Sequence, residues 1–174
     1  HERARAFVKI QGGCERYCSF CIIPKARGPV RSKAPEALRE ELQTLVQAGY
    51  QEVVLVGINL SCYGSELGLH LIDAIELAAS VPGIERIRLG SLEPELLTSE
   101  DIRRMAALPQ VCPQFHLSLQ SGCDATLRRM NRHYDTAEYA RIAGDLCAAF
   151  DHCAITTDIM VGFPGEDDAE LRLN

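Results

Sequence analysis

Three cysteine thiols lie close together near the start of the chain, at Cys14, Cys18 and Cys21. A structural zinc site closes with four ligands, and no further cysteine follows Cys21 until Cys62. A cubane iron–sulfur cluster has four irons, so three cysteines leave one iron open to a small molecule. A ferredoxin-type electron carrier would supply a fourth, regularly spaced cysteine. The spacing therefore favours a catalytic cluster.

The composition places these thiols in a globular protein. The chain has 174 residues, 47% of them hydrophobic, which is enough to bury one substantial core. Eight cysteines are about 5% of the chain, below the ~8–10% of secreted disulfide scaffolds. No window approaches the roughly 18 apolar residues of a membrane span, and no export signal is apparent. We therefore expect a cytoplasmic protein that does not enter the membrane.

The charge is negative overall but locally basic. The formal net charge of −6 excludes a basic footprint for nucleic acid over the whole chain. Two basic runs, however, offer a positive rim to an anionic partner. They consist of Lys25, Arg27, Arg31 and Lys33, and of Arg128, Arg129, Arg132 and His133. A solvated helix face is the alternative for the second run.

Five apolar strands are expected to alternate with helices. The strands cover residues 6–10, 53–56, 84–89, 115–119 and 154–161. Helical spacing of apolar residues predicts helices after Pro35, over 72–79, after a capping box at Thr98 and Asp101, near 125–130 and from about Thr136. This alternation implies right-handed crossovers and a parallel sheet. Five strands are too few for a closed eight-stranded barrel, so we expect an α/β fold with an open partial barrel or a doubly wound sheet.

Polar residues and glycines follow the ends of these strands, where functional loops gather in either architecture. They are Asn59, Ser91, Glu93, Gln120, Ser121, Gly162 and Gly165. A buried Glu93 would need a partner such as an amine or an arginine, whereas a surface carboxylate would not. The other segments are either ligand contacts or plain turns. The remaining cysteines have scattered spacing, which favours small buried side chains, with Cys62 placed in a loop on the same rim.

Cys14-x3-Cys18-x2-Cys21, with Phe20 before the last cysteine, resembles the signature loop of radical S-adenosylmethionine (SAM) enzymes. Further segments are similar to the methylthiotransferases, and most of all to those that modify threonylcarbamoyladenosine in tRNA. These segments are 9–14, 21–28, 31–32, 91–94, 116–122 and 157–166.

The resemblance implies an open partial (β/α) barrel of the radical SAM type, with about five parallel strands present and the sixth truncated. It implies a [4Fe–4S] cluster on Cys14, Cys18 and Cys21. SAM would bind the open iron, and one electron would cleave it to a 5′-deoxyadenosyl radical. The SAM contacts that it implies are Phe20, Asn59, Ser91, Glu93, Gln120, Ser121, Gly162 and Gly165.

The same resemblance implies that residues 1–174 are only the core domain of a longer enzyme. An N-terminal domain with a second cluster and a C-terminal RNA-binding domain would be absent, and the piece is expected to be monomeric. The expected reaction is methylthiolation at C2 of N6-threonylcarbamoyladenosine next to the anticodon, with tRNA as substrate and flavodoxin or ferredoxin as reductant. The alternatives are isopentenyladenosine or a ribosomal-protein aspartate as substrate, or a non-catalytic zinc or iron–sulfur module.

Overall fold

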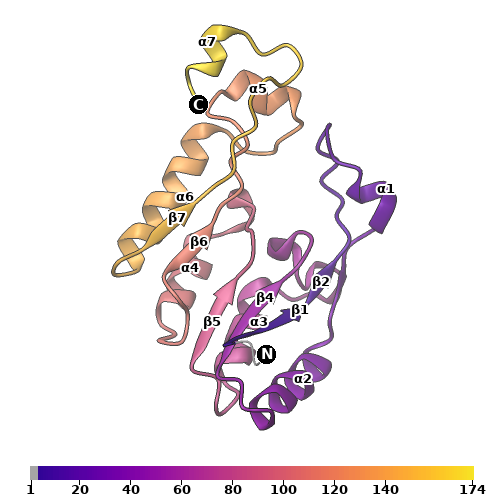
Figure 1. Cartoon of the computed structure of the whole chain (residues 1–174), viewed down its shortest axis with the longest axis vertical. Helices are drawn as coiled ribbons and strands as arrows, with labels where there is room; N and C mark the ends of the chain where they lie inside the picture. Colours follow the sequence, from indigo (N-terminus) through magenta and orange to yellow (C-terminus); the bar gives the residue numbers. More distant parts are fainter. Residues whose placement is uncertain (1–3) are drawn as a thin grey trace.

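Five parallel strands form an open sheet in a computed structural model, which describes residues 4–174 (Figure 1). The strands are β1 (Ala6–Lys9), β4 (Glu52–Val56), β5 (Arg86–Leu89), β6 (Gln114–His116) and β7 (Ala154–Thr156). β1, β4 and β5 pair in that order, β6 pairs with β7, and a parallel bridge between Leu92 and Leu117 joins the two groups. The predicted α/β fold with five parallel strands is confirmed. Residues 1–3 of the predicted domain lie outside the described part.

Four longer helices connect the strands and lie on one face of the sheet: α2 (Pro35–Gln47), α3 (Leu71–Ala79), α4 (Ser99–Ala106) and α6 (Thr136–Ala149) (Figure 1). Three shorter helices lie at the carboxyl ends of the strands: α1 (Ile23–Arg27), α5 (Asp124–Arg129) and α7 (Asp168–Leu171). The predicted capping box is present, because Thr98 Oγ1 accepts from the Asp101 amide and Asp101 Oδ2 accepts from the Thr98 amide, both at 3.1 Å. α2, α3, α4 and α6 pack against one another in chain order.

The burial of alternate residues shows that the other face is open. On β1, Ala6 and Val8 are buried, whereas Phe7 is 57% exposed. Phe7 pairs with Val54, and Val54 pairs with Arg88, so these three side chains share the other face, on which Val54 is 7% exposed and Arg88 is half-buried. A doubly wound sheet would bury both faces under helices. The described elements therefore form the open barrel-like arrangement rather than the doubly wound one.

Several short elements were not predicted. Two-residue strands β2 (Gln11–Gly12) and β3 (Arg31–Ser32) pair antiparallel and join the two ends of the cysteine loop. Three 3₁₀ helices, η1 (Leu60–Cys62), η2 (Ser65–Leu67) and η3 (Pro94–Leu96), lie in the strand-end loops. The strand predicted over 154–161 was too long, because β7 ends at Thr156 and beyond it only Ile159 bridges to Gln120.

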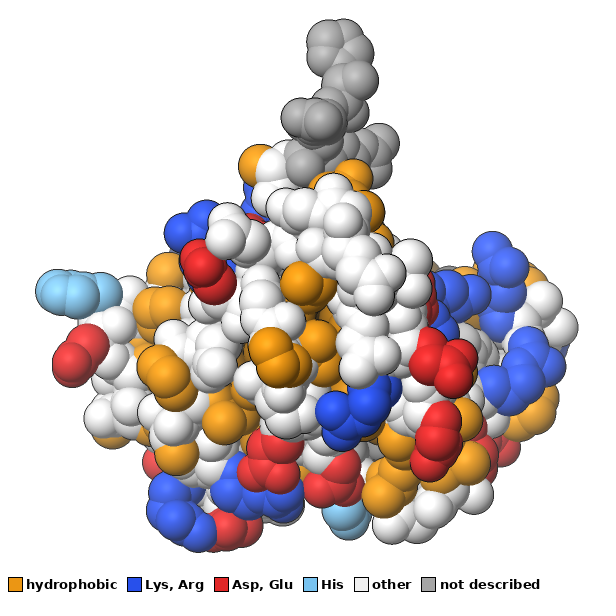
Figure 2. Space-filling model, turned by 90° about the horizontal axis from the view of Figure 1, so that it is seen from below, with side chains coloured by type: hydrophobic (Ala, Val, Ile, Leu, Met, Phe, Trp, Pro, Cys, Tyr) orange, Lys and Arg blue, Asp and Glu red, His pale blue; other side chains and the backbone are white. Residues whose placement is uncertain are grey.

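On the face seen from the strands' amino ends, acidic and basic side chains are interspersed with hydrophobic ones (Figure 2). No helix within residues 4–174 is long and apolar enough to cross a bilayer.

The cysteines outside the loop differ in burial. Cys112 and Cys123 are buried as predicted. Cys147 is exposed because it lies on the outward side of α6, so the prediction that its side chain is buried is wrong.

Candidate functional site

The cysteine loop is closed at its base by a close backbone approach. The Cys14 amide donates to the Gly28 carbonyl at 3.1 Å. Gly13 has a φ of +76°, and a Cβ at this position would lie 1.8 Å from the Pro29 carbonyl oxygen. Only glycine fits here, since any side chain would collide with backbone. Gly13 therefore sets the point at which the cysteine loop begins.

The carboxyl end of α5 docks onto the middle of this loop. The Ser19 amide donates to the Met130 carbonyl at 3.0 Å, and Ser19 Oγ donates to the Arg129 carbonyl at 2.9 Å. In return, Asn131 Nδ2 donates to the Tyr17 carbonyl at 2.9 Å. Tyr17 and Asn131 both have positive φ, 52° and 56°, a conformation that non-glycine residues adopt only where the surroundings hold it. Residues 17–19 and 129–131 therefore fix each other.

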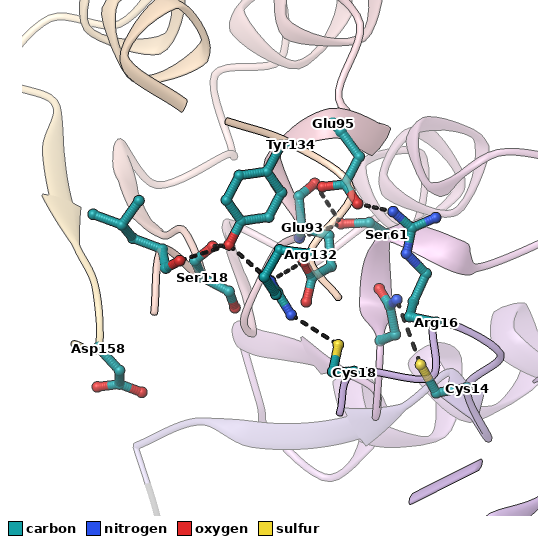
Figure 3. A network of polar contacts seen from close by, with 12 residues as sticks. Cys14, Arg16, Cys18, Ser61, Glu93, Glu95, Ser118, Arg132, Tyr134 and Asp158 are labelled. Atoms are coloured by element: carbon teal, nitrogen blue, oxygen red, sulfur yellow. Dashed lines mark hydrogen bonds and ion pairs between the residues drawn. The ribbon is translucent and has the colours of Figure 1, made fainter. Parts of the chain in front are cut away.

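Two of the three candidate sulfur ligands receive N–H donors. Arg132 Nη1 donates to Cys18 Sγ at 3.2 Å, and Asn59 Nδ2 donates to Cys14 Sγ at 3.8 Å (Figure 3). Burial raises the pKa of the Cys18 thiol, and the Arg132 guanidinium lowers it in part. The third cysteine is tied through its backbone, because the Cys21 amide donates to the Cys18 carbonyl at 2.9 Å. Donors aimed at sulfur suit thiolates, the form that ligates metal.

Asn59 is held beside the cysteine loop by Gln11. The Gln11 side chain is buried, donates to the Gly13 carbonyl at 2.8 Å and accepts from the Asn59 amide at 2.9 Å. A Cβ at Gly57 would approach Gln11 Oε1 to 2.8 Å, so glycine is required for this contact. Asn59 itself is 5% exposed, and its Oδ1 has no partner within the described residues.

Of the two alternatives for Glu93, the structure shows the largely buried one, with an arginine as its partner. Its carboxylate pairs with Arg132, whose side chain is 5% exposed, and its amide donates to Ser61 Oγ at 2.9 Å. Two residues later Glu95 pairs with Arg16 of the cysteine loop (Figure 3). Burial raises the pKa of Glu93, whereas Arg132 and Arg16 lower it. The loop after β5 thus holds both the cysteine loop and the α5–α6 connection.

Phe20 contacts the glycine-rich turn after β7. Its ring lies edge to face against that of Phe163, with centroids 6.2 Å apart. Phe163 lies between Gly162 and Gly165, which have φ values of +72° and +82°. No described atom lies within 4 Å of a Cβ placed on Gly162, so backbone is accessible there. Two segments that are far apart in the sequence therefore meet at the cysteine loop.

The other residues predicted to contact SAM lie on the same rim, and they differ in burial and in hydrogen bonding. Ser91 is exposed. Gln120 has a positive φ of 72° and exchanges backbone hydrogen bonds with Asp158 and Met160. The Ser121 hydroxyl is fully buried, donates to Asn174 Oδ1 at 3.0 Å and accepts from the Cys123 amide at 3.1 Å. Contact of these residues with SAM stays a prediction.

Three thiols, two of which receive side-chain N–H donors, are a donor set that can hold a cubane cluster. Within residues 4–174, no group of three or more Cys, His, Asp or Glu side chains converges on one ion position. The irons of a cubane occupy separate corners, so its thiolates need not converge on one point. All eight cysteines are unpaired, and the unpartnered Asn59 Oδ1 beside Cys14 offers an acceptor to a ligand amine.

The role of Arg132 in the site was not predicted from the sequence. Arg132 was grouped into one basic run, but the arginines of that run have different surroundings in the structure. Arg129 pairs with Glu170, Arg128 is exposed, and Arg132 turns inward to Glu93 and Cys18. The signal that could have led to Arg132 is Glu93, because its buried alternative would need a cation from a neighbouring loop.

Comparison with known proteins agrees with this arrangement. The chain is 39% identical over 172 residues to the threonylcarbamoyladenosine tRNA methylthiotransferase MtaB of Thermotoga maritima, covering 98% of this chain and 40% of that protein. It is 43% identical over 173 residues to the tRNA-2-methylthio-N(6)-dimethylallyladenosine synthase of Caldicellulosiruptor saccharolyticus, covering 98% and 37%. The chain therefore spans about two fifths of the length of these relatives.

Solved structures share the fold at low sequence identity. A cobalamin-dependent SAM radical enzyme, OxsB, superposes with a TM-score of 0.73 at 13% identity, over 97% of this chain and 25% of that one. Methylornithine synthase (PylB) gives a TM-score of 0.66 at 16% identity, over 97% and 48%. The radical SAM family model matches residues 8–173, nearly the whole chain. This chain belongs to the radical SAM superfamily, whose members use a [4Fe–4S] cluster and SAM.

Proposed function

We propose that this chain is the radical-generating core of a tRNA methylthiotransferase, with Cys14, Cys18 and Cys21 as ligands of a [4Fe–4S] cluster. The observation that carries the proposal is the loop itself. Two of its three sulfurs receive side-chain N–H donors, and the loops after β4, β5 and β7 and the α5–α6 connection all contact it. The N-terminal second cluster and C-terminal RNA-binding domain belong to the proposed whole protein.

Several residues of this chain position the cysteine loop and contact the proposed cofactors. The Gln11 side chain places Asn59 against Cys14, and Arg132 places its N–H on Cys18. Asn59 Oδ1 is the acceptor that we assign to the SAM amine. The contact between the rings of Phe20 and Phe163 joins the cysteine loop to the turn after β7. When bound, the cluster supplies the electron that cleaves SAM to the 5′-deoxyadenosyl radical.

Anaerobic reconstitution tests this assignment against a zinc module. Purified protein loaded with iron and sulfide should become brown, bind about four irons per cysteine loop and release 5′-deoxyadenosine from SAM with dithionite. Cys18→Ala should abolish the colour due to this loop and the product. Cys112→Ala is the matched control, because Cys112 is buried beside β5, where its amide donates to the Ile87 carbonyl. Colourless protein with stoichiometric zinc would overturn the proposal.

For the substrate we propose N6-threonylcarbamoyladenosine beside the anticodon, with tRNA as partner and flavodoxin or ferredoxin as reductant in the cytoplasm. The motif likeness described above supports it, together with the relative named for that nucleoside. The second candidate is N6-dimethylallyladenosine, because a synthase named for its methylthio derivative is 43% identical.

Nucleoside analysis of tRNA from cells that lack the gene separates the two. Loss of 2-methylthio-N6-threonylcarbamoyladenosine alone supports the first candidate, and loss of 2-methylthio-N6-dimethylallyladenosine alone supports the second. Restoration by the wild-type gene and not by a Cys14→Ala gene ties the loss to this loop. If both nucleosides persist, tRNA methylthiolation is excluded as the function.

A further inference from the structure

Arg132 is a buried cation with more partners than charge neutralisation needs. Its side chain is 5% exposed and pairs with Glu93. Its Nε and Nη2 donate to Tyr134 Oη at 3.0 and 2.9 Å, and its guanidinium lies 4.9 Å from the centroid of the Tyr134 ring. Tyr134 Oη in turn lies 2.8 Å from the Leu119 carbonyl. Glu93 neutralises the charge and the Tyr134 hydroxyl accepts from Nε and Nη2, whereas Nη1 is directed at Cys18 Sγ.

The backbone around Arg132 and the partners of its side chain hold Nη1 toward Cys18 Sγ. Residues 129–131, which precede Arg132, hold residues 17–19 through three hydrogen bonds, so the backbone beside Cys18 and the backbone of Arg132 form one unit. Glu93 and Tyr134 then fix the plane of the guanidinium (Figure 3). The planar fork of arginine can donate in three directions at once, which the point charge of lysine cannot do in a fixed geometry.

We propose that Arg132 is a positioning residue that fixes the Cys18 thiolate and raises the reduction potential of the cluster through its N–H···S hydrogen bond and positive charge. Hydrogen bonds to sulfur and local charge are two of the quantities that set the potential of an iron–sulfur cluster. Contacts behind a ligand also orient it. The inference rests on the proposed ligation of the cluster by Cys18. The step concerned is the addition of one electron to the cluster from a reductant, which is dithionite in the assay.

The test uses the protein that contains this chain, reconstituted anaerobically. Arg132→Met removes the donors, Arg132→Lys keeps the charge, and Arg132→Met with Glu93→Gln also removes the carboxylate that would be left buried and unpaired. Arg129→Met is the matched control, because Arg129 precedes the same connection but its guanidinium pairs with Glu170. The reduction midpoint of the cluster is measured by electron paramagnetic resonance during dithionite titration, together with iron content and the melting temperature.

We expect the midpoint to become more negative in Arg132→Met and in the double variant, with Arg132→Lys in between and Arg129→Met unchanged. A role in packing alone would lower the melting temperature without moving the midpoint of the variants that retain iron. An unchanged midpoint in the double variant therefore overturns the proposal. If neither methionine variant retains iron, the lysine variant decides, and an unchanged midpoint in it overturns the proposal.

Cys18→Ala separates failure of this inference from failure of the proposed function. The signal of the cluster on this loop, as distinct from that of the proposed N-terminal cluster, should be lost in Cys18→Ala. If the signal of the loop cluster persists, the ligand assignment is wrong and the role of Arg132 falls with it. If it is lost but the Arg132 variants titrate like the parent protein, the ligand assignment stands and only the role of Arg132 is overturned.

Discussion

The ring of Phe20 lies edge to face against the ring of Phe163, with their planes at 80°. Phe20 belongs to the cysteine loop after β1, and Phe163 belongs to the turn after β7, at opposite ends of the sheet (Figure 1). The contact therefore joins the two edge strands through their loops. It holds the rim together across the open side of the sheet, where no described strand pairs with β1 and β7 together.

Phe163→Leu should weaken this junction. Aromatic pairs contribute about 0.5–1.5 kcal/mol beyond the area that they bury, so we expect the free energy of unfolding to fall by about 1 kcal/mol. A double-mutant cycle with Phe20→Leu, followed by urea denaturation, should give a coupling energy in that range. Phe7→Leu is the control, because Phe7 is exposed on the open face. Additive effects of Phe20→Leu and Phe163→Leu would contradict the coupling.

Gly13→Ala should be far more harmful than Gly68→Ala. Both glycines have a positive φ, +76° and +69°, so both substitutions carry the roughly 1–2 kcal/mol cost of a left-handed alanine. Only at Gly13 would the Cβ collide with backbone, at 1.8 Å from the Pro29 carbonyl oxygen, whereas Gly68 has open space within 4 Å. Denaturation should show a loss of about 1–2 kcal/mol for Gly68→Ala and a clearly larger one for Gly13→Ala. Equal losses would mean that the loop base can widen.

The sequence predicted the strands and long helices because their periodicity is local. Val53 to Val56 and the capping box at Thr98 contain their own structural signal. The two-residue strands β2 and β3 were missed because their pairing depends on residues that are far apart in the chain. An amine or an arginine was expected as the partner of Glu93 only if that residue were buried. That the partner is Arg132 depends on how the loops after β5 and β6 meet. Tertiary contacts of this kind leave no periodic trace in a single sequence.

Gln11→Met should lower the free energy of unfolding. The substitution leaves the Asn59 amide and the Gly13 carbonyl without the partners that Gln11 provides. A buried polar group left unpaired costs about 1–3 kcal/mol, so we expect a loss of at least about 2 kcal/mol in chemical denaturation. Gln43→Met, on the exposed side of α2, should change stability by less than about 0.5 kcal/mol. Similar losses in both variants would show that the Gln11 contacts add nothing to stability.

Glu52→Gln should make stability less sensitive to acid. The buried Glu52 carboxylate accepts from Arg88 Nε at 2.7 Å and from Arg86 Nε at 2.8 Å. These hydrogen bonds, that with Arg88 above all, hold the pKa of Glu52 below its ordinary value of 4.5, although burial acts in the opposite direction.

Because the pKa in the folded state is the lower one, the stabilisation is present above pH 4.5 and is lost as pH falls through the folded-state value. At neutral pH we expect Glu52→Gln to lower the free energy of unfolding by about 1 kcal/mol, since both arginines reach solvent. Urea denaturation at a series of pH values should show the two proteins converging below pH 4.5. Glu100→Gln is the control, because its ion pair with Arg103 is exposed. A difference between Glu52→Gln and wild type that stays constant down to the most acidic pH would show that packing, rather than the carboxylate charge, is the source of the effect.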